Sequence, residues 1–249
     1  MTELTHKSPR LYICEDLREG QNITLNNDQG HYLGNVLRLK EGAQIRLFNT
    51  KQGEWLAVTG VNKKKKYDAT VVKQLQKPIK NNNLWLYCAP IKRAYFDFII
   101  MKATELGVSH IAPILTARTQ VREINLQRCE SIAIEAAEQS ERLTVPKILE
   151  PQLLADMVKT GPAGQLPLIC AEFGEALPIQ ECLKKLSEHS YSSIAIVTGP
   201  EGGFSVEELN LLCGMPHAVA IRLGPRILRA DTAAIAALSC WQAMCGDWK

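Results

Sequence analysis

The 249-residue sequence lacks the glycine-rich signatures with which many α/β proteins bind phosphates. Neither G-x-G-x-x-G nor G-x-x-x-x-G-K-[ST] occurs anywhere in the chain. These absences exclude the usual dinucleotide fingerprint and the P-loop. Aromatic residues make up only 6% of the chain, and they form no pattern typical of a sheet on which RNA bases stack.

The sequence also lacks long apolar runs and paired cysteines. No run approaches the roughly 18 residues of a membrane span, so we expect no membrane partner. The polar segment 1–10 has no apolar signal core, and we therefore expect a cytoplasmic protein. The eight cysteines form no C-x-x-C pair, which indicates reduced thiols and no metal site.

What the sequence does contain is enough apolar material for a core, 46%, and an uneven distribution of charge. Residues 1–80 hold 14 Lys and Arg against 8 Asp and Glu, whereas the remainder holds 15 against 18. A basic N-terminal module on a slightly acidic body favours a part that binds a polyanion, joined to a catalytic part. Chance segregation of surface charge is the alternative.

The first 75 residues read as short β segments separated by turns, with one helical stretch at 31–39. This pattern predicts a small β-barrel domain at 1–75 and a second domain at 76–249. The expected strands of the barrel are 10–14, 23–25, 44–48, 54–61 and 69–75.

From Leu84 onward, short apolar runs alternate with helical spacing, which predicts an α/β domain with a parallel sheet and helices on both faces. Ser205 and Glu208 form a capping-box pattern at the start of one helix, and Asp231 or Thr232 is the expected N-cap of the last. The expected strands are 84–88, 108–115, 166–170, 194–197 and 218–221.

Two Gly-Pro loops are the most informative segments. V-T-G-P-E-G-G-F spans 197–204, and I-R-L-G-P-R-I-L-R-A-D-T-A-A-I-A-A spans 221–237. Each follows a predicted strand and opens into a helix, so both belong at the carboxyl ends of strands, where open α/β sheets bind ligands. Glycine lets a ligand approach the main chain closely, although each loop alone also fits a tight turn without a ligand.

Together these loops resemble the cofactor-binding motifs of the RsmE family, which belongs to the SPOUT class of RNA methyltransferases. K-A-T-E-L-G-V at 102–108, E-A-A-E-Q-S-E-R at 135–142 and His31 with N-V-L-R at 35–38 resemble further motifs of that family. The chain departs from it at Ala230-Asp231, where the family usually has Thr-Glu. The resemblance implies a SPOUT domain with a C-terminal trefoil knot, preceded by a PUA-like RNA-binding barrel.

The resemblance also implies a cofactor, S-adenosylmethionine, and a set of site residues. Glu201 is expected to hold either the loop or the ribose of the cofactor in place. The alternative role of Glu201 is to cap the next helix. The residues implied to bind the cofactor are Thr198, Gly199, Glu201, Gly203, Leu223, Gly224, Ile227 and Leu228.

For catalysis we favour Arg229 near the reacting base. Arg226 is the alternative, because one of the two has a structural role. Glu138 or a water removes the proton, and Arg229 or Arg142 stabilises the developing anion. Alternatively, Glu138 and Arg142 belong to a row of ion pairs, four residues apart, on the solvent-exposed face of a helix.

The candidates for RNA contacts are Arg10, Arg38, Lys63 and Lys64. The two lysines belong to a run that is also typical of a solvated hairpin tip.

The implied reaction is methylation of N3 of a uridine in small-subunit (16S) ribosomal RNA, in the assembled or nearly assembled subunit. The resemblance also implies a homodimer, and the small residues of the last helix allow the close backbone approach that a knot or a twofold interface demands. The alternatives are a catalytically silent RNA-binding or assembly factor, and a SPOUT enzyme that methylates a ribose 2′-hydroxyl of transfer RNA.

Overall fold

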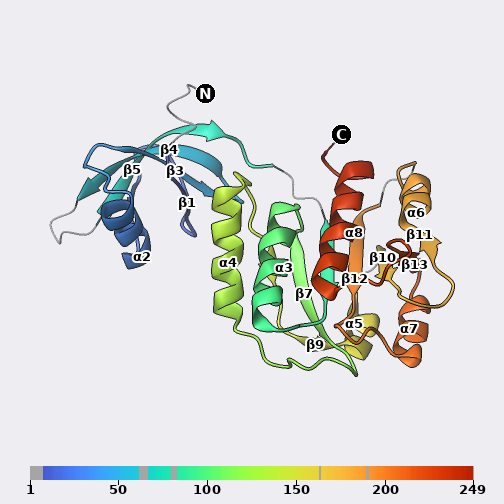
Figure 1. Cartoon of the computed structure of the whole chain (residues 1–249). Helices are drawn as coiled ribbons and strands as arrows, with labels where there is room; N and C mark the ends of the chain where they lie inside the picture. Colours follow the sequence, from blue (N-terminus) through green and yellow to red (C-terminus); the bar gives the residue numbers. More distant parts are fainter. Residues whose placement is uncertain (1–7, 62–66, 80–82, 163, 189–190, 249) are drawn as a thin grey trace. The chain divides into compact units, whose positions relative to one another are not determined.

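The computed structural model describes residues 8–61, 67–79, 83–162, 164–188 and 191–248 (Figure 1). The chain divides into two compact units. Unit 1 comprises Met1–Lys80 with Ala137–Val145, and unit 2 comprises Asn81–Ala136 with Pro146–Lys249. The short segment Ala137–Val145, which we placed in the second domain, therefore groups with the N-terminal unit.

Unit 1 is built on a five-stranded sheet in the order β1-β3-β4-β5-β2. Its pairings are antiparallel except that between β1 and β3, and the strands fall on the predicted segments. The predicted helical stretch 31–39 contains the π-helix η1 (Tyr32–Val36), whereas helix α2 (Asn27–His31) begins four residues before that stretch. The strands are β1 (Arg10–Tyr12), β2 (Asn22–Thr24), β3 (Gln44–Asn49), β4 (Gly53–Val61) and β5 (Tyr67–Gln76).

An apolar cluster fills unit 1 and draws on all five strands. Ile45, Leu47 and Ala57 face this cluster from β3 and β4, whereas Arg46 and Phe48, on the other face of β3, are buried as well. The cluster comprises Leu11, Ile13, Leu17, Ile23, Leu25, Leu33, Ile45, Leu47, Ala57, Ala69 and Val71.

Unit 2 is the predicted parallel α/β sheet, in the order β11-β13-β10-β12-β6-β7-β8, with β9 paired to β7. Every recorded pairing within it is parallel, and its central strands are buried, as a sheet covered on both faces requires. The strands are β6 (Leu84–Cys88), β7 (His110–Leu115), β8 (Lys147–Ile148), β9 (Gln152–Leu153), β10 (Gln165–Cys170), β11 (Leu177–Pro178), β12 (Ser193–Thr198) and β13 (Val219–Arg222).

The helices of unit 2 form two groups. Helix α8 (Ala230–Met244) contacts α3 (Arg93–Glu105), α6 (Ile179–Leu186) and β12. Helices α5 (Leu154–Thr160) and α7 (Val206–Cys213) contact each other and bury apolar side chains with β6, β7, β10 and β12. Helix α4 (Leu126–Gln139) begins in unit 2, and its last residues belong to unit 1.

The start of α8 differs from the prediction. The helix begins at Ala230, and its N-cap is Arg229, which has an extended backbone (φ −67°, ψ 155°). The Arg229 side chain makes no capping hydrogen bond. The Asp231 carboxylate instead accepts a hydrogen bond from the Thr232 N–H inside the first turn, at 2.9 Å. The prediction that Asp231 or Thr232 is the N-cap is therefore wrong, because the observed N-cap lies two or three residues earlier.

Candidate functional site

Three neighbouring strands, β13, β10 and β12, end at a common pocket of about 290 Å³ in unit 2. Because the strands are parallel, their carboxyl ends meet at one edge of the sheet, and the three following loops form the pocket walls. The lining residues are Cys170, Ala171, Glu172, Phe173, Gly174, Ala176, Thr198, Gly199, Pro200, Gly203, Phe204, Leu209, Ile221, Arg222, Leu223, Gly224, Pro225, Arg226, Ile227, Leu228, Ala230 and Ala233.

Both Gly-Pro loops contribute to this pocket. Seven of the eight residues predicted to bind a cofactor line it, and only Glu201 does not. In the described part of the chain, the backbone N–H groups of Leu223, Gly224, Ile227 and Leu228 have no recorded hydrogen-bond acceptor. A loop whose backbone donors are unused in this way is suited to bind a ligand through its main chain.

Glycine is needed in the first loop for its geometry. Gly203 has a left-handed backbone (φ +65°), and its N–H donates to the Pro200 carbonyl at 2.9 Å, which closes a tight turn. A Cβ at Gly199 would lie 3.3 Å from the Phe204 ring, so a larger residue here would have to displace that ring slightly. The loop is therefore preshaped before any ligand binds.

The first loop is held in place by the helix that follows it. Ser205 caps α7 by accepting from the Glu208 N–H, and Glu208 accepts from the Ser205 N–H in return, which confirms the predicted capping box. The other Glu208 oxygen accepts from the Ala117 N–H at 2.6 Å. Arg118 donates to the Gly202 carbonyl at 2.7 Å. The loop after β7 therefore braces the first Gly-Pro loop.

Arg229 lies next to the pocket and is not among its lining residues. Its guanidinium carbon is 4.2 Å from the centre of the Tyr95 ring, and its Nε is 3.9 Å from Asp231 Oδ1. The contact with Tyr95, and then the charges of Asp231 and Glu201, raise the pKa of Arg229. The side chain is 60% exposed, so this positively charged group stays available to solvent and substrate.

Glu201 is exposed, and it does not cap α7, because Ser205 occupies the N-cap position. The helix-cap interpretation of Glu201 is therefore wrong, since α7 begins only at Val206, five residues after Glu201. Its charge contributes to the field around Arg229.

The sequence reasoning missed the third wall of the pocket, the loop after β10. This loop contributes Glu172, and the predicted strand at 166–170 was its only signal. Because β10 lies between β12 and β13, the rule that ligands bind at neighbouring carboxyl ends points to this loop once the strand order is known. The strand order itself is not readable from local pattern.

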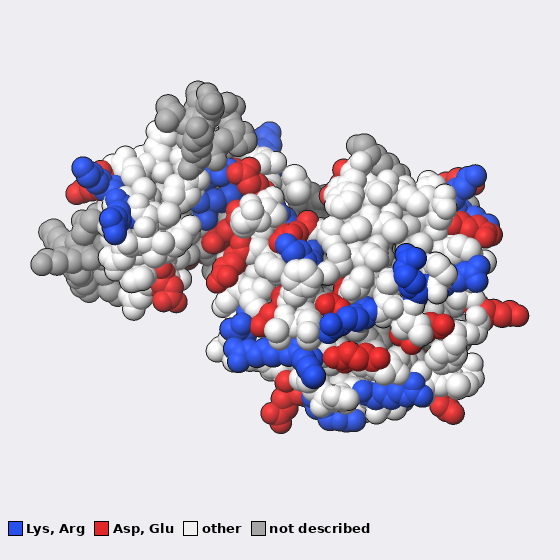
Figure 2. All heavy atoms as spheres, viewed as in Figure 1, with Lys and Arg blue, Asp and Glu red and all other residues white. Residues whose placement is uncertain are grey.

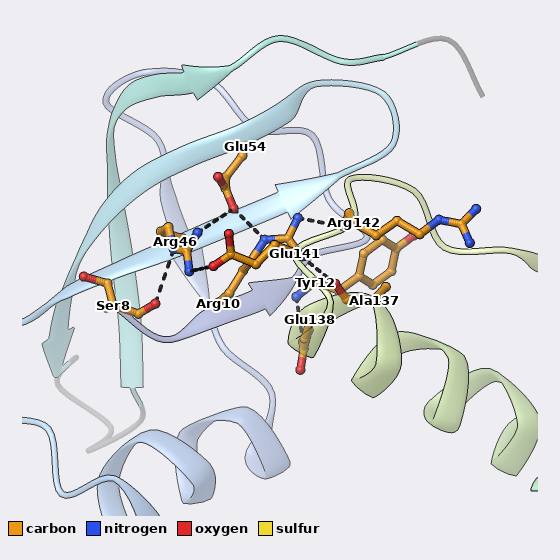
Figure 3. A network of polar contacts seen from close by, with 9 residues as sticks. All are labelled: Ser8, Arg10, Tyr12, Arg46, Glu54, Ala137, Glu138, Glu141 and Arg142. Atoms are coloured by element: carbon orange, nitrogen blue, oxygen red, sulfur yellow. Dashed lines mark hydrogen bonds and ion pairs between the residues drawn. The ribbon is translucent and has the colours of Figure 1, made fainter. Parts of the chain in front are cut away.

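Arg10 lies in a buried network of unit 1, drawn in Figure 3. Its Nε donates to Glu54 at 2.5 Å, and its two terminal nitrogens donate to the carbonyls of Ala137 and Arg142 at 2.7 Å each. The guanidinium also lies 3.5 Å from the centre of the Phe48 ring. The prediction that Arg10 contacts RNA phosphates is wrong, because the side chain is buried and engaged within the unit.

Glu138 and Arg142 both belong to unit 1. A Glu138 carboxylate oxygen accepts from the Tyr12 N–H at 2.8 Å, and Arg142 Nε donates to the Thr144 hydroxyl at 2.8 Å. Their proposed roles in catalysis stay predictions. Glu141, with φ +59°, pairs with Arg46 at 2.7 Å and belongs to the same network (Figure 3).

Arg38, an RNA-contact candidate, is exposed in unit 1 and has a left-handed backbone with φ +54°. Its role stays a prediction. Lys63 and Lys64 lie outside the described residues.

Among the described residues, no group of three or more His, Cys, Asp or Glu side chains is arranged to hold a metal ion. A search of the same residues finds no helix that combines the length and the apolar character needed to cross a membrane.

Comparison with known proteins gives two family matches. The RNA methyltransferase domain matches residues 78–242, and the RNA methyltransferase PUA domain matches residues 25–72. The chain is 39% identical over 234 residues to ribosomal RNA small subunit methyltransferase E of Rickettsia conorii, with 94% of each chain covered. It is 30% identical over 253 residues to the protein of that name from Buchnera aphidicola, covering 98% of this chain and 96% of the other.

Among solved structures, the chain is similar to the crystal structure of ribosomal RNA small subunit methyltransferase E from Neisseria gonorrhoeae bound to S-adenosylmethionine. The TM-score is 0.85 at 30% identity, and the match covers 97% of this chain and 100% of the other.

Proposed function

Because the chain belongs to the family of the ribosomal RNA small subunit methyltransferases E, we propose that it methylates N3 of a uridine in small-subunit (16S) ribosomal RNA. It is an S-adenosylmethionine-dependent RNA methyltransferase by family. The choice of N3 is our proposal. The observation that carries the assignment of the site is the pocket whose walls are the two Gly-Pro loops at the ends of β12 and β13.

The residues of this pocket fit S-adenosylmethionine. The unused backbone donors of the second loop suit the acceptor atoms of an adenine, and Ala230 and Ala233 place the first turn of α8 against the pocket. The positive end of a helix favours a carboxylate such as that of the methionine part. The residues that we propose to hold the cofactor are Thr198, Gly199, Gly203, Leu223, Gly224, Ile227 and Leu228.

The bound cofactor supplies an electrophilic methyl group on a sulfonium. The protein must hold the uridine nitrogen in line with that group and remove its proton. Arg229 is positively charged and half-exposed beside the pocket, so we assign it to the negative charge that develops on the base. Glu138 or a water accepts the proton, and Arg142 is the alternative partner of the anion.

Several finer features belong to the same proposal. The substrate is ribosomal RNA in the assembled or nearly assembled subunit, because N3 lies on a pairing edge and the base must be unpaired there. The C-terminal chain forms a trefoil knot, and the protein acts as a cytoplasmic homodimer. Small residues along α8, such as Ala233, Ala236 and Ser239, support close helix packing at a twofold interface.

The test is transfer of labelled methyl from S-adenosylmethionine to small ribosomal subunits that lack the modification, followed by identification of the labelled nucleoside. We expect N3-methyluridine. A label on a ribose hydroxyl would replace the N3 assignment with 2′-O-methylation. Cofactor binding without transfer would favour an assembly factor, and would direct attention to the Ala230-Asp231 departure from the family pattern.

A further inference from the structure

We propose that Glu172 binds the ribose hydroxyls of the cofactor through its carboxylate. This inference rests on the proposed function and extends it to a residue that neither Gly-Pro loop contains. Glu172 is the second residue after β10, in the loop that forms the third wall of the pocket. Since β10 lies between β12 and β13, its loop emerges between the two cofactor loops.

The position of the carboxylate is set by Gly203. A Cβ built on Gly203 would lie 3.0 Å from Glu172 Oε2, so the carboxylate lies directly against the backbone of the first Gly-Pro loop. A Cβ there would crowd the carboxylate, and the left-handed φ of +65° at this position also favours glycine. The same glycine therefore shapes the turn and leaves room for the acidic side chain.

The carboxylate has no partner within the described protein. No hydrogen bond or ion pair of Glu172 is recorded, and both of its oxygens are available as acceptors. It is also the only acidic residue among the lining residues that the structure describes. Glu208 in helix α7 shows the contrast, since its carboxylate accepts hydrogen bonds from the Ser205 and Ala117 N–H groups.

A carboxylate with two free oxygens matches a vicinal diol, because each hydroxyl donates to one oxygen. Acidic side chains bind ribose in this way in other α/β folds, where they follow a strand at the ligand-binding edge of the sheet. The negative charge also suits a cofactor that carries a sulfonium. The ammonium group of the methionine part could also donate to the Glu172 carboxylate, and the experiment distinguishes the ribose hydroxyls from this ammonium group.

The experiment measures binding of S-adenosylhomocysteine by calorimetry to the full-length wild type and to Glu172→Gln and Glu172→Ala. Glu175→Gln is the matched control, because Glu175 is exposed in the same loop and does not line the pocket. We expect Glu172→Ala to weaken binding by about tenfold or more, the loss typical of a hydrogen bond to a charged group. Glu172→Gln keeps one acceptor and loses less, and Glu175→Gln binds like wild type.

The same proteins are then titrated with 5′-methylthioadenosine, which retains the ribose and adenine and lacks the amino-acid part. Loss of affinity by the same factor supports the ribose assignment. If Glu172→Ala binds 5′-methylthioadenosine as tightly as wild type but binds S-adenosylhomocysteine more weakly, the ribose assignment is overturned in favour of the ammonium group. Equal binding of S-adenosylhomocysteine by wild type and Glu172→Ala overturns any role for Glu172. Failure of the wild type to bind at all refutes the proposed function instead.

Discussion

At the residue scale, Arg229 is positioned by an aromatic ring. Its guanidinium lies over Tyr95 of α3, while Asp231 is near the limit of an ion pair at 3.9 Å. A cation held over a ring keeps its outer donors free, whereas a bidentate carboxylate would occupy them. We infer that Tyr95 acts through Arg229, by fixing where the positive charge lies beside the pocket.

We expect Arg229→Ala to lower kcat by about 10²–10³-fold, because the charge opposite the developing anion is lost. The dissociation constant of S-adenosylhomocysteine should stay unchanged, since Arg229 does not line the pocket. Tyr95→Phe keeps the ring and should retain activity, whereas Tyr95→Ala should lower kcat. The double variant Tyr95→Ala with Arg229→Ala should have the same kcat as Arg229→Ala alone.

Arg93→Lys is the control for Arg229→Ala, since Arg93 is a 75% exposed arginine near the start of the same helix as Tyr95. Additive losses in the double variant would show that Tyr95 does not act through Arg229. An unchanged kcat in Arg229→Ala would remove Arg229 from the mechanism.

At the element scale, a buried charge network joins β1, β3 and β4 to the end of α4 and the residues after it (Figure 3). Glu54 is its centre, since its Oε1 lies 2.5 Å from Arg10 Nε and 3.6 Å from Arg46. Burial lowers the pKa of Arg10, and the hydrogen bond that Arg10 donates to Glu54 opposes that shift. The network holds the segment Ala137–Val145 within unit 1.

Glu54→Gln should destabilise unit 1 by about 3–5 kcal/mol, because it leaves two buried guanidinium groups without their shared carboxylate. Hydrogen exchange measured by mass spectrometry on the full chain should show faster exchange in β3 and β4 and no change in β10 and β12. Glu41→Gln is the control, as Glu41 is exposed in the same unit. Equal exchange in the two variants would mean that the network contributes little to stability.

The strands and the two Gly-Pro loops were predictable because their signals are local. Apolar runs such as Leu84–Cys88 and the Ser205–Glu208 box are set by residues within one element. Arg10 was misassigned because its partners at Ala137 and Arg142 lie far along the chain, and no local pattern indicates them. Glu172 was missed for the same reason, since its importance depends on the order of the strands.

At the scale of the whole molecule, the excess of basic residues in 1–80 does not produce one continuous positive surface on the face drawn in Figure 2. There, among the described residues, basic and acidic side chains are interspersed. On this face, attraction of RNA phosphates is expected from particular exposed cations, and Arg38 is the described one that the sequence singles out in unit 1.

We predict that Arg38→Asn raises KM for the ribosomal subunit and leaves the affinity for S-adenosylhomocysteine unchanged. Asparagine tolerates the left-handed backbone of this position, so the substitution removes the charge without straining the fold. The slope of log KM against log salt should fall by about one, as expected when one phosphate contact is lost. Arg18→Asn, at another exposed arginine of unit 1, is the control. If both variants changed the slope equally, the effect would reflect net charge, and Arg38 would have no specific place in the RNA interface.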